Sequence, residues 1–361
     1  MTQAELTERN VGQNLDDLMN LDPRGYGVCR ILYPASRGRA GEPVSTLFAK
    51  RLLDAVPAGG LVHIITGFVL LPHKRGEMDG IVGAALFARA LNAIGRKAAI
   101  IVPEACVQAA RALAAAVGLH SYPGVERALE YPHSVAVVAF PTGSALAEMA
   151  ARDILDRRKP GAVVATEAAG ANAMGCYHTA LGLDVTDLEA KSEALFRLAQ
   201  SENIPTFAIG DLGNEIGMGA FADHLDAYIP RAGRCLGREC IIADTSADVA
   251  LTATVSDWGM NAVIAALAYL TETPALLHSA EIQREAMLAA SRSGMVNMYG
   301  DLNPAIDGFD IDFNVTLLHL MRRLVESALG LRRTCAGWFS DVIARGFYDA
   351  VRHSSTLTGN P

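Results

Sequence analysis

Residues 206–219 read TFAIGDLGNEIGMG, a short apolar run that leads directly into a loop of glycines and acids. A run of this length without polar residues at alternate positions is typical of a strand buried on both faces of a parallel sheet. The loop begins where the predicted strand ends. In open parallel sheets this end of a strand is where ligands bind. The stretch therefore predicts both a sheet type and a binding edge.

The same pattern recurs along the chain, because short apolar runs alternate with longer Ala- and Leu-rich ones. This alternation predicts an α/β fold, a Rossmann-like parallel or mostly parallel sheet flanked by helices. The predicted strands are 61–66 (LVHIIT), 98–102 (AAIIV), 135–140 (VAVVAF), 162–166 (AVVAT) and 206–209, with 240–243 and 250–254 as further candidates. The predicted helices between them are 81–94, 104–117, 144–158 and 187–200.

Beyond residue 258 the pattern becomes mostly helical, which predicts a helical C-terminal part. The helices expected there are 258–270, 280–291, 314–329 and 338–350. There is no internal repeat and no low-complexity linker, so the economical prediction is one α/β domain over 1–361. A smaller lobe around 230–310 is the alternative.

Composition narrows the classes of partner. The 361 residues include 31 Lys and Arg and 39 Asp and Glu, for a net charge of −8, and 51% are hydrophobic, which excludes a disordered chain. An acidic chain lacks the clustered cations that nucleic acids and anionic membranes require, and no uncharged apolar run reaches the 18 residues of a membrane span. We therefore expect a small-molecule substrate, no nucleic acid and no membrane partner, with a homo-oligomer left open.

The N-terminal residues and the cysteines bear on location. The first 25 residues carry five acids and no apolar segment, so they fit neither a secretory signal nor a transit peptide, and a cytoplasmic location is the default expectation. None of the cysteines forms a Cys-x-x-Cys pair, and free buried thiols are the expectation. They are Cys29, Cys106, Cys176, Cys235, Cys240 and Cys335.

Acidic residues follow three of the predicted strands. Glu77 and Asp79 precede the helix after strand 61–66, Glu167 directly follows strand 162–166, and Asp211 and Glu215 lie in the loop quoted above. Carboxylates gathered in one crevice repel one another unless a cation neutralises them, and a hard divalent ion such as Mn²⁺ or Mg²⁺ prefers oxygen ligands. For Glu77 and Asp79 the alternative is that acids in a first helical turn merely complement the helix dipole.

Other catalytic motifs are absent from the sequence. The glycine spacing of 210–219 fits neither the dinucleotide-binding nor the phosphate-binding loop, and neither His-Glu-x-x-His nor Gly-x-Ser-x-Gly occurs. Lys74, which shortly precedes Glu77, is either a clamp for an anionic substrate or a solvated loop charge. Asp257 is expected to be the N-cap of the helix that begins at Trp258.

Together these loops resemble the D-glutamate cyclase family, specifically its C-terminal cyclase-like domain, from about Leu15 to the last helices. The resemblance rests on Glu77-Met78-Asp79-Gly80 with Gly83-Ala84-Ala85, Glu167 with Gly170 and Tyr177, the loop Gly210 to Gly219, and Ser256-Asp257-Trp258-Gly259. The sequence departs from the family pattern at Leu212, where glycine is usual. It departs again at Ala168-Ala169, where an Arg-Pro pair is usual.

The resemblance implies a metal-dependent lyase that converts D-glutamate reversibly to 5-oxo-D-proline with loss of water. In this hypothesis the metal ion is bound by Glu77, Asp79, Asp211 and Glu215. The catalytic residues are Glu167, Asp211 and Glu215, with Glu167 a ligand or general base. Substrate is bound by Lys74, Gly213, Asn214 and Gly217. Two alternatives stay open: a divalent-metal-dependent hydrolase acting on a phosphoester or a lactam, and a non-catalytic protein that binds a metal or an amino acid.

Overall fold

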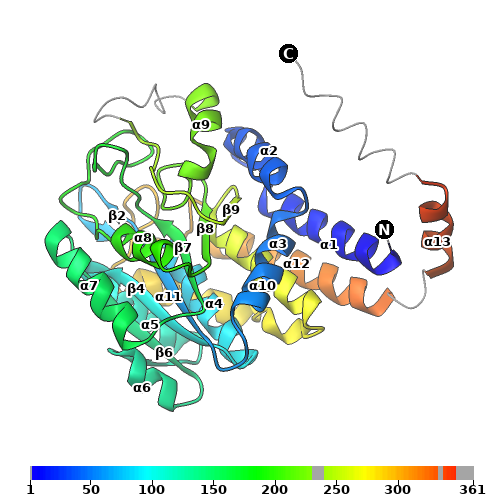
Figure 1. Ribbon diagram of the computed structural model, residues 1–361, viewed down its shortest axis with the longest axis horizontal. Helices are drawn as coiled ribbons and strands as arrows, with labels where there is room; N and C mark the ends of the chain where they lie inside the picture. The colour runs from blue at the N-terminus through cyan, green and yellow to red at the C-terminus, as the bar shows by residue number, and fades with distance from the viewer. Residues whose placement is uncertain (1, 230–239, 332–335, 347–361) are drawn as a thin grey trace.

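A parallel sheet forms the centre of the molecule in the computed structural model, which describes residues 2–229, 240–331 and 336–346 (Figure 1). Seven parallel strands lie in the order β5-β6-β4-β1-β7-β8-β9, and a two-stranded hairpin, β2 and β3, stands apart. The α/β prediction is confirmed. The strand bounds are β1 Leu61–Gly67, β2 Val69–Leu70, β3 Arg75–Gly76, β4 Lys97–Pro103, β5 His120–Tyr122, β6 Ser134–Phe140, β7 Ala162–Ala168, β8 Thr206–Gly210 and β9 Val249–Thr252.

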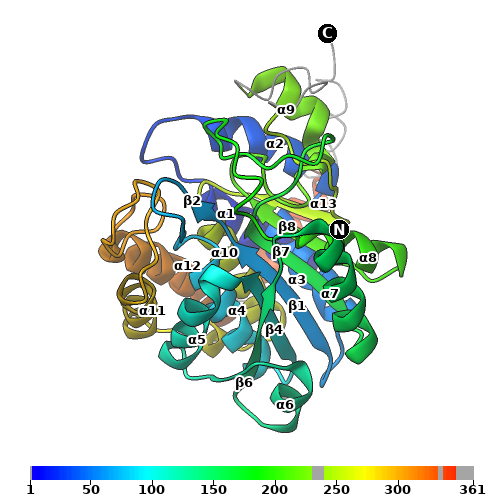
Figure 2. The same ribbon diagram turned by 90° about the vertical axis from the view of Figure 1, so that its left-hand side faces the viewer.

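Helices cover both faces of this sheet (Figure 2). On one face, α3 Val44–Ala55, α4 Ile81–Ala93, α5 Val107–Ala116 and α10 Ser256–Leu270 pack on the sheet, with α1 Gln3–Met19, α11 Ala280–Arg292 and α12 Ile311–Leu331 outside them. On the other face lie α2 Val28–Ala40, α7 Ser144–Arg157, α8 Glu193–Ser201 and α9 Ala222–Tyr228. The remaining helices are α6 Val125–Glu130 and α13 Ala336–Ala344, with short 3₁₀ turns η1 Glu104–Cys106, η2 Gly219–Phe221 and η3 Pro274–Leu276.

Helix α10 is buried almost throughout. Its residues from Ser256 to Tyr269 are all buried, because it lies between the sheet and the outer helices α1 and α12. The indole Nε1 of Trp258 donates a 2.9 Å hydrogen bond to Oδ1 of Asn314 on α12, and its ring stacks on Phe313 at 5.4 Å between centroids. A helix that is apolar on every side belongs in the interior of a layered fold, which is where it lies.

The strand predictions were correct for the five central runs and for β9, but two other predictions were wrong. Residues 240–243 form no strand, and the helix predicted over 187–200 begins only at Glu193. The preceding turn is held by Glu189, whose buried carboxylate accepts the amide of Val69 at 2.8 Å. This long-range bond holds residues 187–192 out of a helix, and local sequence pattern does not reveal it. The four late helices are confirmed, although residues 347–350 of the last prediction lie outside the described residues.

Three N-terminal helices were not predicted, and Asp16 of α1 ties them together. Its carboxylate accepts hydrogen bonds from the amides of Val44 and Ser45 at the start of α3, from the Ser45 hydroxyl, and from the hydroxyl of Tyr33 on α2 at 2.9 Å. Asp16 is fully buried. An acid in α1 thus supplies the N-terminal hydrogen-bond acceptor for α3, which begins at Val44 without a side-chain cap of its own.

The cysteine prediction holds for part of the chain. Cys29, Cys106 and Cys176 are free and buried. Cys240 is disulfide-bonded, so the expectation of a free thiol was wrong there. Cys235 and Cys335 lie outside the described residues.

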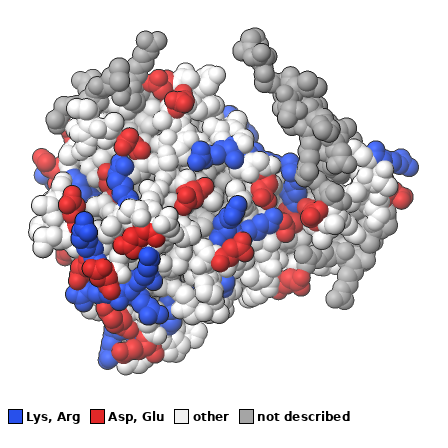
Figure 3. Space-filling view, viewed as in Figure 1, with Lys and Arg blue, Asp and Glu red and all other residues white. Residues whose placement is uncertain are grey.

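Charged side chains of both signs are mixed on the face of the molecule shown in Figure 3. Figure 3 shows Lys and Arg interleaved with Asp and Glu over the side that holds α6 and α7, where Arg157 pairs with Asp153 at 2.8 Å and Arg127 with Glu130 at 3.0 Å. Within the described residues, no helix combines the length and apolarity that crossing a bilayer requires.

The role of Asp16 predicts a stability effect specific to this residue. Replacing Asp16 with Ala leaves the buried amides of Val44 and Ser45 without an acceptor, and we expect a loss of about 2–3 kcal/mol in the free energy of unfolding. Urea denaturation followed by circular dichroism measures it. The matched control is Asp17→Ala at the exposed neighbour, expected within about 0.5 kcal/mol of the unchanged protein. Equal effects of the two changes would contradict the role given to Asp16.

Candidate functional site

The predicted acids meet at the carboxyl edge of the sheet, where the chain reverses its order of strands. From β1 the chain builds the sheet on one side through β4, β5 and β6, then returns to place β7 on the other side of β1. The crevice between β1 and β7 is therefore the topological switch point, where loops diverge and leave space for a ligand.

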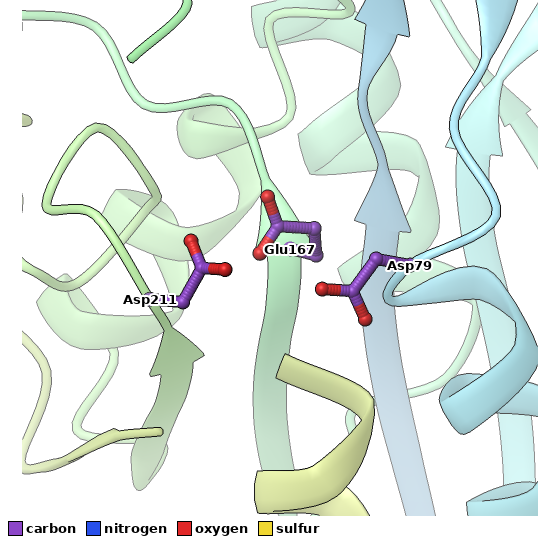
Figure 4. Close-up of side chains that lie close together, drawn as sticks. All are labelled: Asp79, Glu167 and Asp211. Atoms are coloured by element: carbon purple, nitrogen blue, oxygen red, sulfur yellow. The ribbon is translucent and has the colours of Figure 1, made fainter. Parts of the chain in front are cut away.

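Three carboxylates converge in this crevice. Asp79, Glu167 and Asp211 each offer an oxygen, and these oxygens all lie within 4.8 Å of one another. All three side chains are buried, with at most 7% of any residue exposed. Figure 4 shows them pointing toward one another from the turn before α4, the end of β7 and the end of β8.

Asp79, which precedes α4, caps the N-terminus of α10, and Asp257 of α10 caps the N-terminus of α4. Oδ1 of Asp79 accepts the amide of Asp257 at 2.9 Å and its Oδ2 accepts that of Ser256 at 3.1 Å, which caps α10. In return, Oδ1 of Asp257 accepts the amides of Gly80 and Gly83 at 2.9 Å each, which caps α4. The prediction that Asp257 caps its own helix was wrong, because the acid lies inside the first turn of α10 and faces the start of α4.

Glu167 is directed into the crevice by a bulge in β7. The pairing of β1 with β7 passes from Thr66–Thr166 to Gly67–Ala168, so Glu167 is the extra residue. Its φ is +42°, an unusual value for a residue with a side chain, and such conformations concentrate at functional sites. Oε2 of Glu167 accepts a 2.6 Å hydrogen bond from the Ser256 hydroxyl.

The glycine-rich loop is held in shape by its own glutamate. The carboxylate of Glu215 accepts the amides of Asp211, Leu212 and Gly213 at 2.7–2.9 Å. Glu215 was predicted to bind metal and to take part in catalysis, and the structure places both of its oxygens on the loop backbone. Within the described residues, Oδ1 of Asp211 is buried without a hydrogen-bond partner, so this oxygen remains available to a ligand.

The glycine positions in this loop have steric reasons. Gly217 has a φ of +93°, and a Cβ there would lie 2.3 Å from the Cβ of Ala208. The amide of Gly217 donates to the Thr245 hydroxyl, and that of Gly213 donates to Glu215. Both amides that were predicted to hold substrate are therefore bonded within the protein.

The other predicted site residues are divided between two places. Glu77 and Asn214 line the same cavity as Glu167, and Asn214 donates from Nδ2 to the carbonyl of His178 at 3.0 Å. Lys74 is exposed and lines a separate hollow beside residues 184–188. The structure thus brings Glu77 and Asn214 to the acids and leaves Lys74 outside.

Burial and like charge both act on these acids. The largest cause is loss of hydration, which raises the pKa of each carboxyl of the cluster well above its ordinary value, and the charges of neighbouring acids raise it further. This holds for Glu77, Asp79, Glu167 and Asp211. Burial also raises the pKa of Asp257 to about 7, although the amides of Gly83 and Gly80 oppose that shift.

The donor set fits a hard divalent cation. Asp79, Glu167 and Asp211 supply only oxygens, the ligands that Mg²⁺ and Mn²⁺ prefer, and Oδ1 of Asp211 has no hydrogen-bond partner in the part of the chain that the structure describes. A cation bound among them would offset the mutual repulsion that raises their pKa values.

A cavity of about 380 Å³ opens from the acids toward the surface. Its acidic lining residues are Asp22, Glu77, Glu167, Asp211 and Asp307. Its walls are mostly apolar and include Val28, Phe68, Leu70, Leu71, Leu181, Leu183, Leu212 and Met298. A concave pocket of this size, with a few convergent polar groups at its base, has the form of a small-molecule site.

Two polar residues of this cavity were not identified from the sequence. Arg24 lies in the loop between α1 and α2, and Asp307 lies in the loop between α11 and α12. The two side chains form an ion pair, with 3.1 Å between Nη1 and Oδ2. Each precedes a glycine in a turn, Arg24-Gly25 and Asp307-Gly308, and a turn signal of this kind is the only local sign of either.

The chain is similar in sequence to known proteins. The model of a family described as D-glutamate cyclase-like, C-terminal, matches residues 15–322. A human protein named D-glutamate cyclase, mitochondrial, is 27% identical over 264 residues. The matched region covers 71% of this chain and 38% of the human protein, so the chain corresponds to less than half of that relative.

The raised pKa values predict how stability depends on pH. A carboxyl with a pKa raised by folding stabilises the folded state at low pH, and this contribution is lost as the pH rises through the folded-state pKa. In EDTA, the midpoint temperature of thermal unfolding should therefore decrease as the pH is raised from 5 to 8. Added Mn²⁺ should raise the midpoint, and more at pH 8, because the ligands must be deprotonated to bind it.

Asp211→Asn provides the comparison for this experiment, because it removes one charge from the cluster. This variant should show a shallower fall with pH in EDTA and a much smaller Mn²⁺ effect. A Mn²⁺ effect of the same size in both proteins would place the ion elsewhere.

Proposed function

The chain belongs to the D-glutamate cyclase-like family, and we propose on this basis that it catalyses reversible ring closure of D-glutamate to 5-oxo-D-proline with the help of a divalent cation. The observation that carries the proposal is the convergence of Asp79, Glu167 and Asp211, of which Glu167 and Asp211 line a cavity of small-molecule size. The substrate in this proposal is taken from the name of the human relative, D-glutamate cyclase.

Ring closure makes specific demands on a site. The amine nitrogen forms a bond to the side-chain carboxyl carbon, one carbon–oxygen bond breaks, and the two protons lost by the ammonium group leave with that oxygen as water. A five-membered ring gives the attack a large proximity advantage, so the main obstacle is the poor electrophilicity of a carboxylate. A bound divalent cation supplies Lewis acidity, which draws charge from carboxylate oxygens.

In this proposal Asp79, Glu167 and Asp211 hold the cation. The helix caps fix Asp79, the Glu215-braced loop fixes Asp211, and the bulge fixes Glu167. All three are therefore held before substrate arrives, and little reorganisation is needed at the moment of reaction.

Glu167 is also the residue best suited to carry protons. Glu167 lines the cavity, and the Ser256 hydroxyl donates a hydrogen bond to its Oε2, which orients the carboxylate. Without a cation, burial, followed by the charges of Glu215, Asp79 and Glu77, raises its pKa. A bound cation would offset that rise, so the proposed role in proton transfer is based on the position of Glu167 in the cavity lining. Glu167 would take the ammonium proton and return it to the departing oxygen.

Turnover of D-glutamate and of 5-oxo-D-proline tests this proposal. With Mn²⁺ present, D-glutamate and 5-oxo-D-proline should interconvert, as followed by chiral chromatography. Glu167→Gln should lower turnover by roughly 10²–10⁴-fold, because it removes proton transfer. The exposed Asp223 on α9 offers a control, and Asp223→Asn should retain full activity.

The alternatives are distinguished by the same incubations. Hydrolysis of p-nitrophenyl phosphate without turnover of D-glutamate or 5-oxo-D-proline would favour a metal-dependent hydrolase and contradict the proposal. Tight Mn²⁺ and D-glutamate binding without any product would favour a binding protein instead.

A further inference from the structure

Arg24 is a cation placed among the acids of the cavity. Of the residues that line this cavity in the described part of the chain, it is the only lysine or arginine, whereas Asp22, Glu77, Glu167, Asp211 and Asp307 all line it. A substrate that carries a carboxylate would meet repulsion along most polar surfaces of this cavity. Near Arg24 it would meet attraction.

The loop that carries Arg24 is rigidly built. Asp22 accepts the amides of Gly25 and Tyr26 at Oδ1, at 3.0 and 3.3 Å, and that of Gly27 at Oδ2, at 2.7 Å. Gly25 and Gly27 have φ values of +70° and +76°, which glycine adopts without strain. The carboxylate of Asp22 thus fixes the backbone on the C-terminal side of the arginine.

The guanidinium group is held on several sides. Its carbon lies 5.3 Å from the ring centre of Tyr26 and 5.2 Å from that of Phe309. Nη1 donates to the carbonyl and to Oδ2 of Asp307, each at 3.1 Å, and lies 3.7 Å from the Met298 sulfur. Nη2 donates to the Thr254 carbonyl at 3.0 Å. These contacts join the loop that carries Arg24 to residue 254 and to residues 298–309, which are distant in sequence.

Arg24 nevertheless keeps donor capacity. A guanidinium has five N–H donors arranged to grip a carboxylate with two parallel hydrogen bonds. The two N–H groups of Nη1 bond to Asp307, and one of the two on Nη2 bonds to Thr254, which leaves the second N–H of Nη2 without a bond among the described residues. Nε also has no partner there, although this atom is itself buried. The side chain is 18% exposed, so it borders the cavity and is not sealed beneath it.

The charge of Arg24 is secure in this setting. Burial lowers its pKa, but the charges of Asp307 and Asp211 raise it, and the net pKa lies above the ordinary value. Arg24 and Asp211 line the same cavity.

We propose that Arg24 binds the α-carboxylate of the substrate, the carboxylate that takes no part in ring closure, and so selects amino acids that carry two carboxylates. This inference rests on the proposed function. One carboxylate of the substrate is held at the Asp79, Glu167 and Asp211 cluster, and the second pairs with Arg24. Asp307 holds the guanidinium in place before the substrate arrives.

Binding of two ligands that differ only in this group tests the inference. With Mn²⁺ present, the unchanged protein should bind D-glutamate roughly 10- to 100-fold more tightly in calorimetry than D-isoglutamine, whose α-carboxyl is an amide. In Arg24→Gln the affinities for D-glutamate and D-isoglutamine should lie within about threefold of each other. In Arg24→Lys it should be intermediate, since lysine keeps the charge but lacks the fork.

Controls separate recognition from a structural role. Arg30→Gln, on the exposed side of α2, should keep the full preference. Asp307→Asn weakens the ion pair that holds the guanidinium, so it should lower the preference, but less than Arg24→Gln does. If Arg24 acted only as a structural partner of Asp307, Asp307→Asn and Arg24→Gln would lower the melting temperature alike and leave the preference unchanged. That result would overturn the inference.

The failure of this inference differs from the failure of the proposed function. A protein that interconverts D-glutamate and 5-oxo-D-proline but shows the same preference in Arg24→Gln has the proposed activity and another carboxylate-binding residue. A protein that neither binds nor turns over these compounds lacks the activity, and the role of Arg24 is then overturned with it. If Arg24→Gln does not fold, Arg24→Lys decides the matter, and an unchanged preference in it would overturn the inference.

Discussion

The burial of three like-charged side chains within 4.8 Å of one another is the constraint on which the rest of the site depends. Ionised carboxylates in a water-poor interior are costly unless dipoles or counter-charges surround them. The protein provides dipoles first. The N-termini of α4 and α10 meet at this point, and the amides of Ser256 and Asp257 point at Asp79. The carboxyl edge of the sheet is thus prepared for negative charge before any cation is present.

Some acids near the site bind backbone amides and so shape the site, and others line the cavity, where they can bind a ligand. Glu215 and Asp257 direct oxygens to backbone amides of the loop and of α4, which fixes the frame. Glu77, Glu167 and Asp211 line the cavity, whereas Asp79 caps α10 through both of its oxygens and also belongs to the trio. The acids of one crevice therefore differ in what they bind. Within the described residues, the buried oxygens without a hydrogen-bond partner include Oδ1 of Asp211 and Oδ2 of Asp257.

The sequence was sufficient for the sheet and for the edge at which the acids gather, because buried parallel strands have a local signature. It was insufficient wherever a role depends on a partner distant in the chain. Asp257 looks like a cap for its own helix and instead caps α4, and Asp16 caps α3 from α1. Nothing local to Arg24 or Asp307 shows that they meet at the cavity. The glycine-rich loop was recognised, but its glycines serve close packing and its glutamate serves the loop.

The central claim is that Asp79, Glu167 and Asp211 form a cation site, and a crystallographic experiment with manganese tests it most directly. Crystals grown at pH 8 with MnCl₂ would be measured at wavelengths on either side of the manganese absorption edge. The account predicts an anomalous difference peak bonded to oxygens of these three carboxylates. A map without a peak there, from crystals in which manganese is bound elsewhere on the chain, would contradict it.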